Sequence, residues 1–457
     1  MKRLIPLISV GLIGFVMIPH APAATLEDAL VGAYRTNPTI QAGRAQQRAT
    51  DETVAQAMSG WRPTLSSFGS YSHVLQDSGI GGANSTANPD VKYNPAGIGA
   101  NLSQPLFRGG RTIAGIREAK SSVQVGRENL ISIEQVVLLQ SITSYMDVFQ
   151  DQAVLELNGR NVQVLTRQLD ATRDRFEVGE ITRTDVAQAE AALSSAISSR
   201  TLADAQLTAS RAEYTKLVGS VPSDLEEPVS LPNLPGSEEE SKAMALAANP
   251  SIGAAKHTEA AAGQGVKGAV GALLPSADAT GEISYTDDAS QFATFVRVKR
   301  VTGEITVPVY QAGRVYSRVR EARQIHRQRR LEVVENQRQV IEQAVTTWSN
   351  FSAVQSTIIS RQEQVRANEI ALEGVRQEAI VGSRTTLDVL EEEQRLLDSR
   401  VELIRAKRDQ QVAAYQLLSV VGGMTAAKLN LPVNVYDPDT NYHKVRNAWI
   451  GFGQSAE

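Results

Sequence analysis

The chain has 457 residues, of which 42% are hydrophobic and 21% are charged, with a formal net charge of −4 and no cysteine. The lack of cysteine excludes disulfides, thiolate metal sites, cysteine nucleophiles and an acylated N-terminal cysteine. The slightly acidic balance provides no basic surplus of the kind that binds nucleic acid, so no nucleic-acid partner is expected.

Residues 1–23 are predicted to be a secretory signal peptide. Two basic residues precede an apolar run of about 15 residues, and Ala21-Pro22-Ala23 supplies a small-residue cleavage site. The run is shorter than the ~20 residues that a membrane-spanning helix needs, and no later apolar run approaches that length. The mature chain is therefore expected either to be soluble after export or to insert as a β-barrel.

The mature chain contains an internal duplication. Asn37-Pro38 recurs as Asn249-Pro250, and Gly179 and Asp185 recur as Gly382 and Asp388 at a nearly equal spacing. A single long period of this kind indicates a duplicated domain and not a solenoid. We predict a first repeat at 24–219, a proline-rich linker at 220–237, a second repeat at 238–422 and a C-terminal segment at 423–457.

Each repeat is predicted to contain the same elements in the same order. An opening helix is followed by two strands, a very long helix, a Val-Gly turn and a last helix; in the first repeat an Asn-Pro pair divides the opening helix. The first repeat has helices at 26–59, 111–177 and 185–218 and strands at 64–74 and 98–107. The second repeat has helices at 238–272, 314–380 and 386–421 and strands at 276–285 and 295–310. The last ~20 residues are expected to be poorly ordered.

The long helix of the first repeat carries a coiled-coil pattern. Ile116, Val123, Leu130 and Val137 lie seven residues apart, and a second run of heptads begins at Leu155. The interval between the two runs is two heptads plus four residues, a stutter that locally unwinds a supercoil. About 67 residues at 1.5 Å each give a rod of roughly 100 Å. The pattern favours a wall of nearly straight helices over a rope.

The four predicted strands are each about ten residues or longer, which is the length of a tilted membrane strand. Four strands cannot close a barrel, because about eight are needed before side chains fill its interior. Open sheet edges are not tolerated in lipid. The strands are therefore predicted to close through oligomerisation, and a dimer, a trimer or a larger assembly satisfies this requirement.

Taken together, these features resemble the TolC family of outer-membrane efflux and type I secretion channels. The most specific features are the Asn-Pro pairs, the segment QPLFRGGR at 104–111 with its partner at 307–314, and the two Val-Gly turns. The resemblance covers the whole mature chain. It implies an α-dominated α+β membrane protein whose homotrimer forms one twelve-stranded outer-membrane β-barrel and a periplasmic α-barrel of long coiled-coil helices, closed at its far tip.

The resemblance also implies a passive exit duct in the outer membrane of a Gram-negative bacterium, extending into the periplasm. The expected partners are a periplasmic adaptor (membrane fusion) protein, an inner-membrane transporter of the ABC or RND type, and outer-membrane lipid. Neither a nucleophile elbow nor metal-ligand spacing is present, so no enzyme activity, cofactor or metal is expected. The alternative is an exported trimeric coiled-coil surface protein of the adhesin kind, although a fibre needs no duplicated hairpins between rods.

The resemblance implies an acidic aperture after the second Val-Gly turn. Asp388 and Glu391 match the family's acidic pair and share one helical face. The other interpretation is a solvated helix face. A symmetric ring of these acids would favour cations and would raise their own pKa values by like-charge repulsion. Glu392 and Glu393 are expected to be ordinary surface residues.

The resemblance further implies a lock between neighbouring hairpins. Arg384 matches an arginine that ties the second hairpin to its neighbour, and the matching acceptors in the first copy are Thr184 and Asp185. Ala379 stands where the family carries a tyrosine that bonds to the neighbouring hairpin, so the closed state is expected to depend heavily on Arg384. The expected adaptor contacts are the two turns themselves: Val178, Gly179, Val381 and Gly382.

Overall fold

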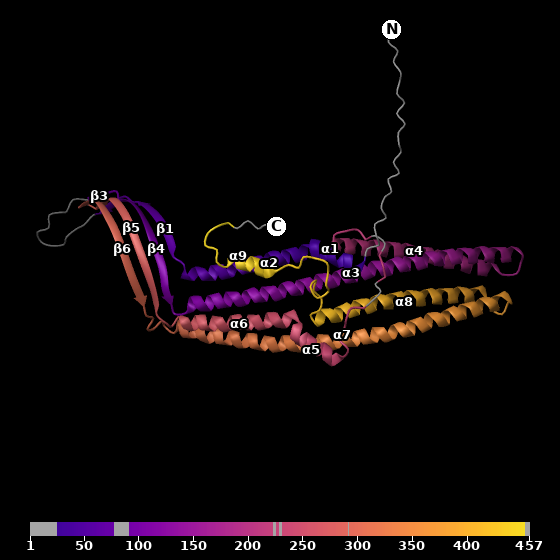
Figure 1. Cartoon of the computed structure of the whole chain (residues 1–457). Helices are drawn as coiled ribbons and strands as arrows, with labels where there is room; N and C mark the ends of the chain where they lie inside the picture. The colour runs from indigo at the N-terminus through magenta and orange to yellow at the C-terminus, as the bar shows by residue number, and fades with distance from the viewer. Residues whose placement is uncertain (1–24, 77–90, 223–224, 228–230, 291, 453–457) are drawn as a thin grey trace, which may run out of the picture.

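The computed structural model describes residues 25–76, 91–222, 225–227, 231–290 and 292–452. The predicted signal peptide, 1–23, lies outside these ranges. Figure 1 shows an elongated molecule in which a curved sheet stands at one end of a bundle of long helices and two helical turns stand at the other. Within the described ranges, none of the helices combines the length and the apolar character that crossing a membrane requires.

The two repeats contain matching helices. The first has α1 (Leu26–Thr36), α2 (Pro38–Met58), the short 3₁₀ turn η1 (Ser59–Trp61), α3 (Arg111–Glu177) and α4 (Arg183–Val218). The second has α5 (Glu238–Ala248), α6 (Pro250–Gly271), α7 (Arg314–Ile380) and α8 (Thr386–Val420). Helices α3 and α7 have the bounds predicted for them, 111–177 and 314–380. Of the eight other predicted helix ends, four match and four differ by one or two residues.

The Asn-Pro pairs divide the opening helices, and each Asn also bonds the last helix of its own repeat. Asn37 caps α2, and its Nδ2 donates to the carbonyl of Leu217 near the end of α4 at 2.9 Å. Asn249 caps α6, and its Nδ2 donates to the carbonyl of Val420 in α8 at 2.9 Å. The helix predicted over 238–272 is therefore two helices, because Asn249 leaves the helical conformation and Pro250 begins a new one.

Four strands form one antiparallel sheet in the order β1-β4-β5-β6. They are β1 (Thr64–Tyr71), β4 (Ala96–Arg108), β5 (Ser276–Ser290) and β6 (Ala293–Thr306). The central β4–β5 pairing joins the two repeats, and β1 and β6 are the edges. A small separate hairpin, β2 (Val74–Gln76) with β3 (Val91–Tyr93), extends beyond the sheet.

Three predicted strand ends differ from the structure by three to five residues, and three others differ by one or two. The strand predicted at 64–74 stops at Tyr71, because the N–H of Ser72 turns to the carbonyl of Pro95 and a new hairpin follows. The strand predicted at 295–310 stops at Thr306, since Pro308 has no N–H to donate to a ladder. The strand predicted at 276–285 continues to Ser290, which still pairs with β6.

The main hydrophobic core lies midway along the rods. There α3 buries Val137, Leu138, Ile142, Tyr145 and Val148, which lie on several faces of the helix. Helices α1, α4 and α8 contact α3, so in this stretch it is covered from more than one side. This stretch coincides with the predicted stutter, because a helix covered on several sides has no single heptad seam.

Towards the tip the packing returns to one seam. Leu165, Leu169 and Thr172 are buried there, as the second run of heptads predicts. A second, small core cluster joins Leu165 to Ala196 of α4. Phe176, which continues the seven-residue spacing from Leu155 through Leu169, is 43% exposed in the protomer and lies one residue before the end of α3.

The C-terminal segment is more ordered than expected. Residues Pro438–Val445 form helix α9, which packs on α2. Asn441 donates to the fully buried Asp51 at 2.8 Å, and Arg127 of α3 pairs with Asp439 at 2.5 Å. Burial raises the pKa of Asp51 in spite of its hydrogen bonds. The cap at Asp437, with proline at the first helical position, was the sequence signal for this helix.

Tyr145 connects the core to the linker between the repeats. Its hydroxyl donates to the carbonyl of Glu226 at 2.7 Å, and its ring is fully buried beside Tyr214. Tyr145→Phe is expected to lower the free energy of unfolding by about 1 kcal/mol, because the hydrogen bond from the Tyr145 hydroxyl to the carbonyl of Glu226 is lost. Thermal unfolding of the extracted protein measures this. Tyr214→Phe is the matched control, and an equal effect of both changes would contradict a specific role for the Tyr145 hydroxyl.

Candidate gate and contact turns at the helical tip

The α3–α4 and α7–α8 turns lie at the end of the molecule opposite the sheet (Figure 1). Gly179 and Gly382 both have φ +78°, which glycine adopts without steric cost. In the first turn Glu180 N–H donates to the carbonyl of Arg175, and in the second Ser383 N–H donates to that of Glu378, both at 3.0 Å. These bonds make both turns Schellman motifs, which require the glycine.

The two valines before the glycines project from the tip. Val178 is 72% exposed and Val381 is 79% exposed in the protomer. Apolar side chains held outward on a turn that glycine fixes are available for contact with another protein. The predicted contact turns are therefore exposed and have nearly identical backbones.

The aspartates that follow the turns are capping residues. Asp388 accepts from the N–H and the hydroxyl of Thr385, each at 2.8 Å, and Asp185 does the same with Thr182 at 2.9 and 2.6 Å. The hydrogen bonds from Thr385 hold the pKa of Asp388 below its usual value. Hydrogen bonds from Thr182 lower the pKa of Asp185 in the same way. In a trimer, repulsion between the acids of different subunits would raise the pKa of Asp388 and oppose the effect of these bonds. The raised pKa expected for a symmetric acidic ring therefore stays a prediction about the assembly.

Arg384 is paired within its own hairpin. Its Nε donates to Oε2 of Glu378 at 2.9 Å, and this bond raises the pKa of Arg384. The first turn has the same kind of pair with the charges exchanged, since Arg175 precedes the turn and bonds Glu180 at 3.1 Å. A single protomer thus does not bring Arg384 to Thr184, which is exposed on the other hairpin.

The acidic run after Asp388 divides into two kinds of residue. Glu391 is exposed, and its Oε2 lies 3.5 Å from Nη2 of Arg395. Glu392 and Glu393 are not ordinary surface residues, because their side chains are only 14% and 12% exposed. Glu392 pairs with Arg395, and Glu393 pairs with Arg376 across the α7–α8 interface.

Sequence reasoning missed this ion pair between helices, although the duplication carried the signal. The first repeat has an equivalent pair between Arg173 of α3 and Glu190 of α4 at 2.7 Å. Arg173 corresponds to Arg376 in the second repeat, and Glu190 corresponds to Glu393 at the same spacing. Both hairpins therefore have this ion pair between their helices near the tip, and α7 and α8 are joined further from the tip by Arg361–Glu402 and Arg400–Glu369.

Glu393→Ala is expected to loosen the second hairpin by about 1–2 kcal/mol, because a mostly buried carboxylate and its hydrogen bond are lost. Hydrogen exchange of the amides around the α7–α8 turn should become roughly tenfold faster. Glu391→Ala, which removes the same charge from an exposed position, serves as the control and should have little effect. Equal protection factors in both variants would show that the pair does not fasten the hairpin.

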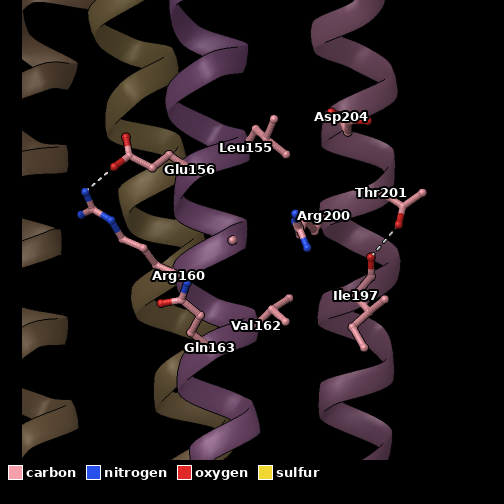
Figure 2. Close-up of a pocket in the computed structure, with 10 residues that line it drawn as sticks. Leu155, Glu156, Arg160, Val162, Gln163, Ile197, Arg200, Thr201 and Asp204 are labelled. Carbon is pink, nitrogen blue, oxygen red and sulfur yellow. Dashed lines mark hydrogen bonds and ion pairs between the residues drawn. The ribbon is translucent and has the colours of Figure 1, made fainter.

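A groove of about 780 Å³ lies between α3 and α4, nearer the middle of the rods. Figure 2 shows its apolar lining from Leu155 and Val162 on one helix and Ile197 on the other. The polar group of Thr201 is satisfied within its own helix, and Arg160 pairs with Glu156. Gln163, Arg200 and Asp204 also line the groove, so its lining is both polar and apolar. Within the described ranges, His, Cys, Asp and Glu side chains nowhere gather in a group of three suited to a metal ion.

This architecture, with two helical rods per repeat and an open four-stranded sheet shared by the repeats, defines a subunit of an outer-membrane channel. A family model described as outer membrane efflux protein matches residues 30–220 and 243–423. The chain belongs to this family, which confirms the resemblance to TolC. The two matched segments are separated by the linker between the repeats.

Relatives and solved structures agree with this assignment. The chain is 36% identical over 439 residues to the outer membrane efflux protein BepC of Brucella suis, covering 94% of this chain and 92% of the relative. It is 23% identical to the outer membrane protein TolC of Escherichia coli, covering 94% and 88%. The Campylobacter jejuni CmeC outer membrane channel has the same fold, with a TM-score of 0.78, 15% identity, and coverage of 92% and 89%.

The protein is therefore an outer-membrane efflux channel component of a Gram-negative bacterium, and it extends into the periplasm. The family and the relatives are channel proteins. This supports the duct over the alternative of a coiled-coil surface fibre, which explains neither the family match nor the sheet.

Proposed function

We propose that three copies of the chain form a passive exit duct that spans the outer membrane and much of the periplasm. The observation that carries this proposal is the four-stranded sheet with free edges at β1 and β6. Lipid cannot satisfy the backbone groups of these edges, so they pair with the edges of neighbouring copies. Three copies close a barrel of twelve strands, and their helices continue it as a tunnel.

The duct catalyses no reaction and has no energy source of its own. A periplasmic adaptor protein connects it to an inner-membrane transporter of the ABC or RND type, which supplies the energy. The adaptor contacts the two turns at the tip, where Val178 and Val381 are held outward beside Gly179 and Gly382. Exposed apolar side chains on rigid turns suit a contact that forms and breaks.

The same tip acts as the gate. In the closed trimer Arg384 exchanges Glu378 for Thr184 and Asp185 of the adjacent hairpin, and its planar fork suits both acceptors. Asp388 and Glu391 line the aperture. Support comes from the position of these residues on neighbouring turns at one end of the molecule and from the exposure of Arg384 and Glu391.

We favour small-molecule efflux as the transport task. The relative that is 36% identical over nearly the whole chain is described as an efflux protein. Secretion of proteins is the second candidate, because the alkaline protease secretion protein AprF of Pseudomonas aeruginosa is 23% identical over 341 residues. Both tasks use the same scaffold, so the adaptor and the transporter decide between them.

Conductance in planar bilayers tests the proposed duct. The purified protein should give discrete, small current steps without any energy source, as expected of a channel that is nearly closed at its tip. Cells that lack the chain should also become sensitive to toxic small molecules and regain resistance on complementation. Protein that inserts and gives no current, in either the wild type or the gate variants, would contradict the proposal.

A further inference from the structure

The two faces of the sheet differ in chemistry. Directly paired residues of an antiparallel sheet share a face. One face carries exposed aliphatic side chains, namely Leu65, Ile98, Leu102, Ile283 and Val301. The opposite face carries polar groups, including Glu282 and Arg300, whose charged atoms lie 3.9 Å apart. Alternation of this kind turns the apolar face toward lipid and the polar face toward the lumen.

Two cations interrupt the apolar face. Arg297 pairs directly with Tyr285, whose other neighbour is Ile98, and Lys299 pairs with Ile283. Both side chains therefore point to the lipid side, and both are exposed. A charge on this surface is costly at the middle of a bilayer and tolerated near its interfaces. The two residues therefore require either a place at the headgroup level or an anionic partner.

The described part of the protomer supplies no carboxylate partner for either cation. Arg297 and Lys299 make no ion pair with a described residue, whereas Arg300 on the polar face has Glu282. Instead the Arg297 guanidinium lies 5.3 Å from the ring centre of Phe295 and 5.6 Å from that of Tyr285. These rings stack on each other with centres 6.1 Å apart.

One acidic residue stands close to this cluster. Asp287 pairs with Phe295 on the same face, and its carboxylate accepts a hydrogen bond from the Tyr285 hydroxyl at 3.4 Å. The Asp287–Phe295 pair lies two residue pairs nearer the hairpin than the Tyr285–Arg297 pair, and Asp287 is not bonded to Arg297. The two cations therefore exceed the acids on this part of the apolar face.

Phe295, Tyr285 and Arg297 lie in the half of the sheet remote from the helices, and Lys299 lies near the middle of β6. Ser290 pairs with Ala293 beside the β5–β6 hairpin, and Phe295 and Arg297 follow within a few residues. Figure 1 shows this hairpin at the far end of the strands. Because the helices extend into the periplasm, this end faces the outer leaflet. Aromatic rings mark the headgroup level, and long cationic side chains extend toward it.

We propose that Arg297 and Lys299, framed by Tyr285 and Phe295, bind the phosphate groups of lipid A, the phosphorylated glycolipid of the outer leaflet. The arginine fork binds a phosphate through two parallel hydrogen bonds, and lysine adds a point charge. The stacked rings hold the guanidinium near the headgroups. Because β6 is an edge strand, each site lies at a seam between subunits. This inference rests on the proposed trimeric barrel and adds a specific lipid to its seams.

Native mass spectrometry of the detergent-extracted trimer tests the site with added diphosphoryl lipid A. The wild type should bind it at least about tenfold more tightly than the completely dephosphorylated lipid, and inorganic phosphate should not displace it. Arg297→Gln with Lys299→Gln should abolish this preference. Arg300→Gln, which removes a positive charge from the opposite face of the same strand, should leave it unchanged.

A wild-type trimer with equal affinity for phosphorylated and dephosphorylated lipid would overturn the site, even if the double variant failed to assemble. Retention of the phosphate preference by an assembled double variant would also overturn it. Displacement by millimolar inorganic phosphate would show an anion site and not a lipid site. Conductance in phosphatidylcholine bilayers, which contain no lipid A, tests the proposed duct separately. Absence of current steps there would contradict the duct, whereas the lipid-binding measurements test only the site at Arg297 and Lys299.

Discussion

Replacing Arg384 with alanine is expected to increase single-channel conductance markedly and to leave the stability of the trimer unchanged. The side chain is half-exposed and bonds only Glu378 in its own hairpin, so it contributes little to the fold of one protomer. In the trimer the proposed contact to Thr184 and Asp185 is repeated three times around the aperture. Ala379 supplies no side-chain hydrogen bond that could replace it.

Two further variants separate the lock between subunits from the bond within the hairpin. Arg384→Lys should give an intermediate conductance, because lysine keeps the charge and loses the fork. Glu378→Ala removes the partner within the hairpin and frees Arg384, so it should not open the channel. If Arg384→Ala leaves conductance untouched while it abolishes export in cells, the turn is an adaptor contact and the gate assignment is wrong.

The second large effect is expected from the aperture acids. Replacing Asp388 and Glu391 with alanine should reduce cation selectivity and weaken block by multivalent cations added from the periplasmic side, because a narrow ring of like charge concentrates counter-ions. The reversal potential in a salt gradient measures the selectivity. Asp388→Asn with Glu391→Gln is the companion variant, since the Asn oxygen can still accept the hydrogen bond from the Thr385 N–H in the capping box of α8. An unchanged reversal potential in an inserted channel would remove both residues from the pore lining.

The pH dependence of selectivity reports on the ring. In the protomer the pKa of Asp388 is lowered by its bonds to Thr385, so its capping contribution is present above the ordinary pKa of an aspartate and is lost only as the pH falls through the lower folded value. If repulsion between the acids of the ring is weak, cation selectivity due to Asp388 should likewise persist below the ordinary pKa of an aspartate and be lost only as the pH falls through the lower folded value. Loss of selectivity already above the ordinary pKa would show that repulsion between subunits exceeds the effect of the cap.

Periodicity and duplication were sufficient to predict the long helices from the sequence. The heptads that include Val123 and Leu130 define a buried seam, and Gly179 and Gly382 mark turns that only glycine closes easily. Strand ends were harder, because a proline and a short hairpin near Val74 interrupt a pattern that otherwise continues. Helix α9 was missed although Asp437 and Pro438 mark its start, because the contact that anchors it, from Asn441 to Asp51, joins residues far apart in the chain.

The tip could be located from the sequence, but its pairings could not. The spacing of Asp388 and Glu391 indicated a shared face, yet the cap formed by Thr385 holds one of them and leaves the other exposed. Glu393 looked like one more acid in a charged run. Glu393 is mostly buried because it packs against Arg376 on the facing helix. The sequence pattern of one helix does not show which residues of another helix lie beside it.

The mass of the folded, membrane-inserted protein tests the central claim most directly. Because β1 and β6 are free edges in the protomer, only an assembly closes the sheet. Native mass spectrometry of protein extracted from outer membranes in mild detergent should give three times the mass of one mature chain, with no folded monomer at any protein concentration that keeps the detergent micelles intact. A folded, inserted species with the mass of a single chain would contradict the account.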